Sequence, residues 1–218
     1  MRDVFVGQIE RLHHEIIEMG GLCEDVITKS AQALIKGDAT IAHEVVTMEP
    51  AIDEKEYIIE GLCSSLLLMQ QPVASDFREI SAASKIIANL SRIAMQAVDI
   101  SETILRVNYN VRPVKTKHFE ELAEAVSKML KDCIDAYAKM DVELAARVID
   151  FDDVVDEFFY KTKANIAKLI KKADSTEEVD YALDLLMIDK YYERIGDHIV
   201  KMAEMVAYVE ADKPIKNN

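Results

Sequence analysis

The segment Tyr191–His198, Tyr-Tyr-Glu-Arg-Ile-Gly-Asp-His, holds the residues of this chain whose types and spacing are best suited to chemistry. Glu193 and Asp197 are four residues apart, in a stretch whose apolar residues recur every three or four positions, which is typical of an amphipathic helix. Both carboxylates therefore leave the same helix face, one turn from each other. Because like charges at this spacing repel, the pair needs either screening by water or a cation.

Similar acidic pairs occur earlier in the chain. Asp152 and Asp156 are four residues apart, and so are Glu49 and Asp53. If the helix that carries Asp152 packs antiparallel to the helix of residues 191–198, four carboxylates can face one groove. Such a group supplies the hard oxygen ligands that suit Mg, Mn, Ca or iron. Without an ion, the clustered negative charge would raise the pKa of some of these carboxyl groups.

The composition favours a mostly helical protein. Half of the 218 residues are hydrophobic, and the chain has only 6 Gly, 4 Pro and no Trp. A formal net charge of −14 argues against a nucleic-acid partner, and it suits a soluble protein that binds cations or basic protein surfaces. The N-terminal residues do not form a signal peptide, and no apolar run reaches membrane-spanning length, so any membrane role would act through a partner.

The cysteines indicate a reducing compartment. Cys23, Cys63 and Cys133 form no Cys-x-x-Cys pair, and each has apolar neighbours with helical spacing. We therefore expect three small buried side chains in a cytoplasmic protein.

The apolar periodicity predicts six long helices joined by short turns. They cover about residues 4–37, 38–69, 73–107, 117–139, 142–172 and 176–209. Asp38, Asp141 and Ser175 are the expected N-caps, Gly37 is the expected C′ residue, and Pro50 is expected to break or kink the second helix. Residues 108–115 are expected to form a linker, and the tail from residue 212 onward to be frayed.

The second half of the chain repeats the first. Asp38 and Asp141 are 103 residues apart, as are Asp53 and Asp156, and Arg92 precedes Arg194 by 102 residues. Each half has three long helices with short connections, so consecutive helices run antiparallel. We therefore predict an all-α fold in which two three-helix bundles occupy residues 1–109 and 110–218.

The repeat leaves the first half with an incomplete acidic site. Ser91, Met95 and Gln96 occupy the positions that correspond to Glu193, Asp197 and His198, although Glu56 and Glu60 extend the acidic face of the second helix. The predicted main metal site consists of Asp152, Asp156, Glu193 and Asp197. Glu49 and Asp53 are predicted to form a weak or empty site.

Other kinds of chemistry have less support. A di-iron oxidase needs Glu-x-x-His on each of two helices, and the chain has this spacing once, at Glu10 and His13. The adjacent His13 and His14 point to different helix faces, so surface or packing roles are expected, and His198 lies one residue off the acidic stripe, where it can at most support a ligand. No Ser-His-Asp order or phosphate-binding loop occurs. A metal-dependent enzyme on a helical bundle and a helical scaffold without metal remain the alternatives.

Three features together resemble the PhoU family: Glu193–His198, the repeated acidic pairs, and Gln71–Arg78, Gln-Pro-Val-Ala-Ser-Asp-Phe-Arg. The resemblance extends over essentially the whole chain. It implies two three-helix bundles that carry clusters of iron or of another metal (Mn, Mg, Zn or Ca) on their acidic pairs, often in homodimers. The substitutions at Ser91, Met95 and Gln96 depart from the family pattern and put the first cluster in question.

The resemblance also implies a role. Members of the family are cytoplasmic, non-enzymatic regulators of phosphate supply. They act between a phosphate ABC transporter, through its ATPase subunit, and a membrane sensor histidine kinase, and they restrain uptake and the phosphate-starvation response when phosphate is plentiful. Because the first half departs from the family pattern at these positions, a divergent relative that serves another transporter is an alternative.

Overall fold

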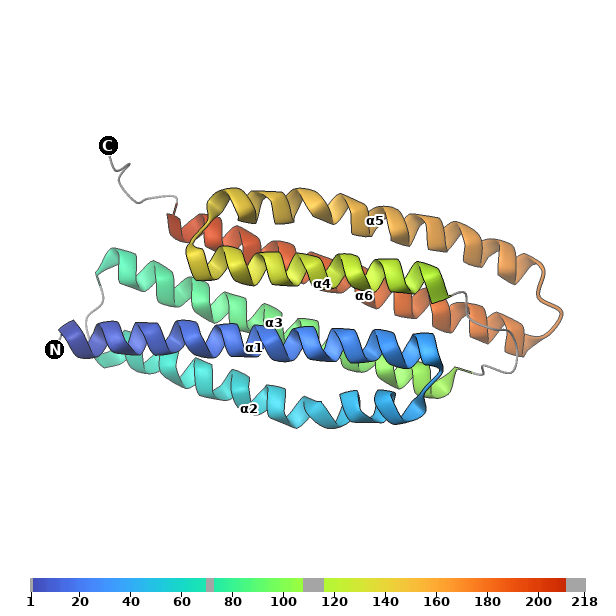
Figure 1. Cartoon of the computed structure of the whole chain (residues 1–218), viewed down its shortest axis with the longest axis horizontal. Helices are drawn as coiled ribbons and strands as arrows, with labels where there is room; N and C mark the ends of the chain where they lie inside the picture. Colours follow the sequence, from blue (N-terminus) through green and yellow to red (C-terminus); the bar gives the residue numbers. More distant parts are fainter. Residues whose placement is uncertain (1, 70–72, 108–115, 211–218) are drawn as a thin grey trace.

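The computed structural model describes residues 2–69, 73–107 and 116–210, which form six helices arranged in two bundles (Figure 1). The helices are α1 (Arg2–Lys36), α2 (Ala39–Met69), α3 (Ala74–Arg106), α4 (Thr116–Lys139), α5 (Val142–Lys171) and α6 (Thr176–Glu210). Helices α1 to α3 pack against one another, as do α4 to α6. The predicted all-α fold with two antiparallel three-helix bundles is confirmed, and the predicted helix ends lie within about two residues of those observed.

The two bundles are joined through α1 with α4 and α3 with α6, which leaves α2 and α5 on the outside (Figure 1). Buried apolar side chains from both bundles form one continuous core. Its largest fully buried members include Leu12, Ile27, Ile86, Tyr137 and Tyr192. The predicted linker at 108–115, with the boundary between residues 109 and 110, and the tail from residue 212 lie outside the described residues.

The predicted helix caps are confirmed. The side-chain oxygens of Asp38, Asp141 and Ser175 accept backbone N–H groups of the following helix at 2.9, 2.9 and 3.3 Å. Each cap satisfies one of the N–H groups that the first turn of a helix leaves without an internal partner.

Pro50 lies inside α2, which continues from Ala39 to Met69. Of the predicted break or kink, the break does not occur. Proline in a helix interior removes one hydrogen bond and costs about 3 kcal/mol. Val45 and Ile52, on either side of it, are 0% and 2% exposed. Burial of two such side chains contributes roughly 3 to 6 kcal/mol, which is enough to hold both parts of the helix against the core.

The turns that follow α1 and α4 share one backbone form. Gly37 and Met140 have φ angles of 62° and 50°, in the left-handed region. In each turn the next residue donates its N–H to a carbonyl five residues earlier, at 3.0 Å in the first and 2.9 Å in the second. Glycine adopts this conformation without strain, whereas Met140 adopts it at a cost of about 1 kcal/mol.

Two alanine substitutions test this account of the turn, and they are expected to change the free energy of unfolding in opposite directions. Gly37→Ala should lower the free energy of unfolding by about 1 kcal/mol, because alanine disfavours the left-handed conformation. Gly21→Ala should raise it by about 0.5 to 1 kcal/mol, because this position lies in a helix interior. An added Cβ at Gly21 meets nothing within 4 Å. Urea unfolding measures both free energies. Changes of the same sign in the two variants would contradict the left-handed conformation assigned to Gly37.

The cysteines are buried, as predicted. Burial raises the pKa of Cys23 and Cys133 to about 12 and that of Cys63 to about 11. The reactive thiolate is therefore disfavoured at all three positions, and these side chains serve packing.

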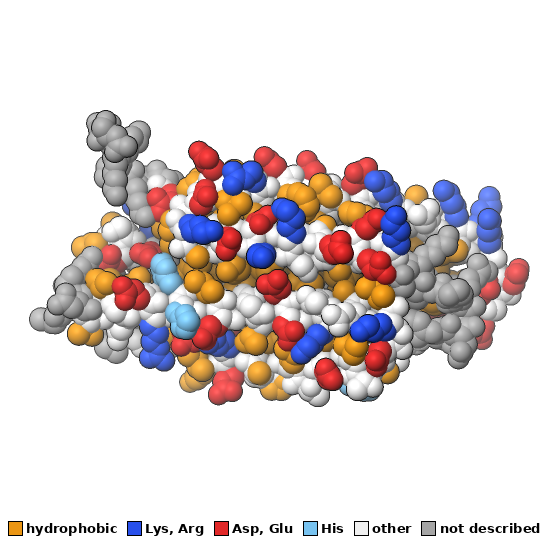
Figure 2. Space-filling model, viewed as in Figure 1, with side chains coloured by type: hydrophobic (Ala, Val, Ile, Leu, Met, Phe, Trp, Pro, Cys, Tyr) orange, Lys and Arg blue, Asp and Glu red, His pale blue; other side chains and the backbone are white. Residues whose placement is uncertain are grey.

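The exposed surface is strongly charged. Figure 2 shows acidic and basic side chains interleaved over the visible face, with apolar side chains between them. Over the ranges that the structure describes, none of the helices is both long enough and apolar enough to span a bilayer.

Candidate metal centre

Helices α5 and α6 bring their acidic pairs close together. The pKa of Asp152, on α5, is raised to about 6. Burial is the largest cause, and the negative charges of Asp156, Asp197 and Glu193 add to it in that order. Asp152 therefore lies within electrostatic reach of the other three predicted ligands, two of which come from α6.

Gly196 allows the two helices to approach at this point. A Cβ added to this residue would lie 2.7 Å from Oδ1 of Asp152 and 3.3 Å from Cγ1 of Val155. A side chain at residue 196 would displace the Asp152 carboxyl group from its position against α6. The sequence-based prediction did not include Gly196, although a glycine inside an uninterrupted helical pattern often marks a close contact.

Gly196→Ala should therefore destabilise the protein by about 1 to 3 kcal/mol, because the new methyl group overlaps Asp152. Gly61→Ala is the matched control, since Gly61 is exposed in α2 and an added Cβ there meets nothing within 4 Å. The control should be neutral or stabilising by up to about 1 kcal/mol. Thermal and urea unfolding compare the two, and a Gly196 variant as stable as the control would contradict the close approach.

Glu193 is held by a neighbouring cation. Its side chain is 14% exposed and accepts a hydrogen bond from Lys190, one turn earlier on α6. The Lys190 ammonium also lies 5.0 Å from the ring centroid of Phe159 on α5. One lysine therefore balances part of the negative charge of this site.

The donor set suits a hard cation. Asp152 and Asp156 are half-buried and Asp197 is exposed, so the carboxylates span the boundary between core and solvent. Within the described residues, no three Asp, Glu, His or Cys side chains already form a group that could hold an ion. Carboxylate oxygens fit Mg, Mn, Ca or iron. For Glu193 to join the other ligands, Lys190 would have to release it.

His198 connects this region to the other bundle. Its Nδ1 shares a hydrogen bond of 2.9 Å with Oδ1 of Asn89, which lies on α3. Burial lowers the pKa of His198, and the charge of Lys201 lowers it further, so the imidazole is neutral at pH 7. Residue 198 thus ties the helix that carries Asp197 to the first bundle.

Among its described residues, the first bundle has no acidic group in which two helices each contribute a pair of carboxylates at the corresponding positions. Glu49 is half-buried and Asp53 is exposed, both on α2. At the corresponding positions of α3, Ser91 and Met95 are half-buried and provide no carboxylate. Glu56 is half-buried, on the same helix as Glu49.

A different charged group lies one turn along α3. The pKa of Asp99 is raised by burial and by Glu102, and to a lesser degree by Glu49. Arg194, from α6, and Arg106 lower it again. Arginine side chains therefore balance the carboxylates here, whereas among the described residues the acidic pairs of α5 and α6 form an ion pair with Lys190 alone. Asp99 was not among the predicted residues.

A buried polar cluster occupies the core of the second bundle. Asp189 is 0% exposed, and its Oδ1 lies 2.7 Å from Nε2 of His118 and 3.2 Å from Oγ1 of Thr162. Oγ1 and Nε2 are 2.5 Å apart. A catalytic relay uses both nitrogens of the imidazole ring, but here the hydroxyl and the carboxylate meet the same nitrogen. The cluster therefore stabilises the core and is not arranged as a nucleophile with its base.

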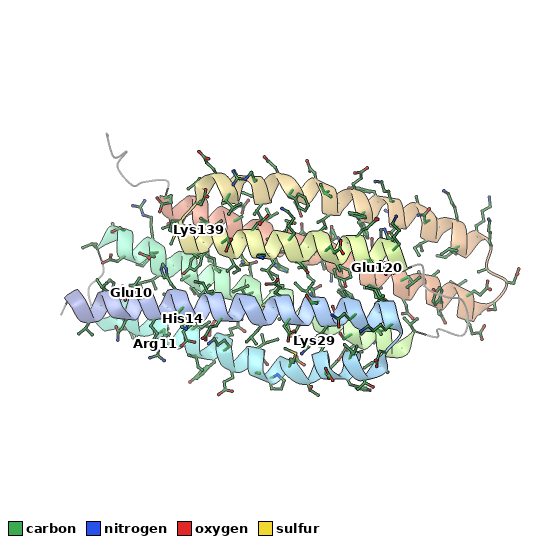
Figure 3. The ribbon with its side chains drawn as sticks, viewed as in Figure 1. Glu10, Arg11, His14, Lys29, Glu120 and Lys139 are labelled. Atoms are coloured by element: carbon green, nitrogen blue, oxygen red, sulfur yellow. The ribbon has the colours of Figure 1, made fainter. Side chains whose placement is uncertain are left out.

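The adjacent histidines of α1 play the surface and packing roles that were predicted. His13 lies 2.8 Å from Glu79 and stacks near Tyr137, with ring centroids 5.2 Å apart. His14, labelled in Figure 3, is 71% exposed and pairs with Glu18 of its own helix at 3.0 Å. The two side chains do not share a site.

A groove of about 380 Å³ runs between α4 and α5. Its lining includes Lys128, Leu144, Arg147 and Phe151, and none of the four carboxylates contributes to it. The acidic group thus lies on the side of α5 that faces α6, apart from this groove.

Comparison with known proteins identifies related chains. The family model described as the PhoU domain matches residues 16–104 and again residues 119–206. The phosphate-specific transport system accessory protein PhoU homolog of Clostridium acetobutylicum is 31% identical over 218 residues, which covers 100% of this chain and 99% of that protein. The protein of the same name from Borreliella burgdorferi is 29% identical and covers 99% and 98%.

Solved structures have the same fold. The crystal structure of PhoU from Pseudomonas aeruginosa superposes with a TM-score of 0.90 at 27% identity, over 96% of this chain and 100% of that one. The phosphate transport system regulatory protein PhoU from Streptococcus pneumoniae superposes with a TM-score of 0.89 at 22% identity, over 98% and 100%. At that lower identity the likeness concerns the fold alone.

Proposed function

This chain belongs to the PhoU family, and from that membership we propose that it is a non-enzymatic, metal-binding regulator of phosphate uptake. The relatives from Clostridium acetobutylicum and Borreliella burgdorferi, similar over nearly their whole length, are named accessory proteins of phosphate-specific transport. The metal part of the proposal is supported by the raised pKa of Asp152, to which Asp156, Asp197 and Glu193 each contribute negative charge, and by the close approach of Asp152 to Gly196 of α6. Such a concentration of negative charge favours a bound cation.

The proposed ligands are Asp152, Asp156, Glu193 and Asp197. A cation bound there would supply positive charge and hold α5 and α6 together through their carboxylates. Iron, Mn, Mg, Zn or Ca all remain possible occupants, because carboxylate oxygens alone do not select among them. Glu49 and Asp53 are proposed to bind metal weakly or not at all.

The proposed partners are the ATPase subunit of a phosphate ABC transporter and a sensor histidine kinase. We further propose a cytoplasmic homodimer that reaches the membrane only through these partners. The net charge of −14 suits docking on basic protein surfaces, where electrostatics sets orientation and association rate. A bound cation would neutralise part of the α5–α6 surface and so alter the docking.

The proposal is tested by measuring binding to the purified transporter ATPase subunit while metal is titrated into protein stripped with a chelator. We expect affinity to change at least about fivefold between the metal-free and loaded forms, the lower end of typical coupling between sites. Elemental analysis of wild type beside Glu193→Gln separates a metal-binding protein from a bare helical scaffold. Binding that is absent under all conditions would contradict the transporter partner, and unchanged affinity would contradict metal control.

A further inference from the structure

Among the described residues, no element covers the outward face of α5. In this part of the chain α5 contacts α4 and α6 alone, so the face opposite them is open to solvent. Six exposed residues follow each other along its centre at spacings of three, four or seven positions, which places them on one side of the helix. This α5 stripe consists of Asp150, Asp153, Glu157, Ala164, Lys168 and Lys171.

Charge is divided sharply along the α5 stripe. Its first three members are acidic and its last two are basic, and residues 158–173 contain five lysines and no acidic residue. In Figure 2, blue side chains gather toward the end of the molecule at which α5 terminates in Figure 1. A helix dipole favours such an order only in the first and last turns, so it does not account for Asp153 or Glu157 in the middle of the helix.

Most of these charges lack a partner within the described part of the chain. Glu157 pairs with Lys161 at 2.9 Å. Asp150, Asp153, Lys168 and Lys171 form no ion pair among the described residues. An entirely acidic or entirely basic partner would match one half of the α5 stripe and repel the other.

The charges of the α5 stripe are complementary to those of a second α5 that runs antiparallel to it. The midpoint of the stripe lies between Tyr160 and Lys161. Asp150 lies as far before this midpoint as Lys171 lies after it, and the same holds for Asp153 with Lys168. An antiparallel copy of α5 therefore sets Asp150 against Lys171 and Asp153 against Lys168, with Glu157 opposite Ala164, and a two-fold axis forms each ion pair twice.

We propose that the α5 stripe is the surface through which two copies of this chain associate, with α5 antiparallel to α5 of the second copy. Near the axis, Tyr160 is 66% exposed and supplies apolar contact area. The small side chain of Ala164 allows the two helices to approach. This inference rests on the homodimer of the proposed function and assigns it a specific face.

Charge reversal tests the face, and sedimentation of the full chain measures the result. Lys168→Glu with Lys171→Glu makes every charged member of the stripe acidic, and Asp150→Lys with Asp153→Lys makes every charged member except Glu157 basic. Each double variant turns four ion pairs into four repulsive contacts, so the dimer dissociation constant should rise at least about 100-fold. Lys163→Glu is the matched control, because this exposed lysine lies off the stripe, and it should leave dimerisation unchanged.

Mixing the two double variants gives the decisive result. The acidic stripe of one complements the basic stripe of the other, so a 1:1 heterodimer should form although neither variant dimerises alone. Circular dichroism confirms that each variant is folded. A wild-type dimer that survives both double variants would overturn the assignment of this face and leave the homodimer intact. A wild type that remains monomeric would overturn both, and binding to the transporter ATPase subunit, measured separately, reports on the rest of the proposed function.

Discussion

Replacing His118 with alanine is expected to lower the free energy of unfolding by about 3 kcal/mol, because it removes a hydrogen-bond partner of the buried Asp189 side chain. Asp189 is 0% exposed, and its closest polar contact is Nε2 of His118 at 2.7 Å. Without the imidazole, Oδ1 of Asp189 keeps only the Thr162 hydroxyl at 3.2 Å. The other oxygen, Oδ2, is buried and has no hydrogen-bond partner within the described residues.

The first bundle supplies the control for this substitution. At the positions corresponding to Thr162 and Asp189 it has Ile59 and Ile87, both 0% exposed. Thr162→Ile combined with Asp189→Ile should therefore keep the stability within about 1 kcal/mol of wild type, since an apolar core of similar volume often replaces a buried polar group without loss. Urea unfolding at pH 7 gives both values. If His118→Ala lowered the free energy of unfolding by less than the double isoleucine variant does, the stabilising role of the contact between His118 and Asp189 would be refuted.

Asp152→Asn is expected to have two effects of opposite sign. Metal affinity should fall at least about tenfold, because one proposed ligand loses its charge. The metal-free protein should become more stable by about 1 kcal/mol at pH 7, a value that already allows for solvent screening of this half-buried side chain. Removing the charge relieves both the burial and the repulsion that raise the pKa of Asp152.

The pH dependence of the metal-free protein follows from the same shift. The pKa of Asp152 is about 6 in the folded protein, whereas an aspartate in an unfolded chain has a pKa of about 4. Between these values the folded state holds a proton that the unfolded state has lost. Unfolding free energy should therefore fall as the pH rises from about 4 to about 6 and stay at the lower value above it. Asp152→Asn should remove this dependence of the unfolding free energy on pH.

Glu49→Gln is the matched control, since Glu49 occupies the corresponding position in the first bundle and is also half-buried. It should leave metal affinity unchanged if the second bundle carries the site. Calorimetric titration and unfolding from pH 4 to pH 8 provide both readouts. Equal loss of affinity in the two variants would place metal in both bundles, and no loss in either would remove the α5–α6 carboxylates as ligands.

Helix position and helix face could be predicted from the sequence because both depend on neighbouring residues. Apolar spacing of three and four predicted six helices, and the N-caps at Asp38, Asp141 and Ser175 were correct because a cap bonds to its own first turn. At Pro50 local propensity predicts a break or a kink, and burial of the flanking residues keeps α2 continuous, so the break does not occur.

The sequence by itself determined the six helices and the acidic pairs at four-residue spacing, because each follows from a periodicity within one segment. It also determined the two bundles, because the second half of the chain repeats the first. Only the tertiary structure decided what lies opposite each pair. The close contact of Gly196 with Asp152 and the cluster of His118, Thr162 and Asp189 join residues from different helices. Such contacts depend on how each helix is rotated and shifted against its neighbours, and core packing over the whole chain sets that register.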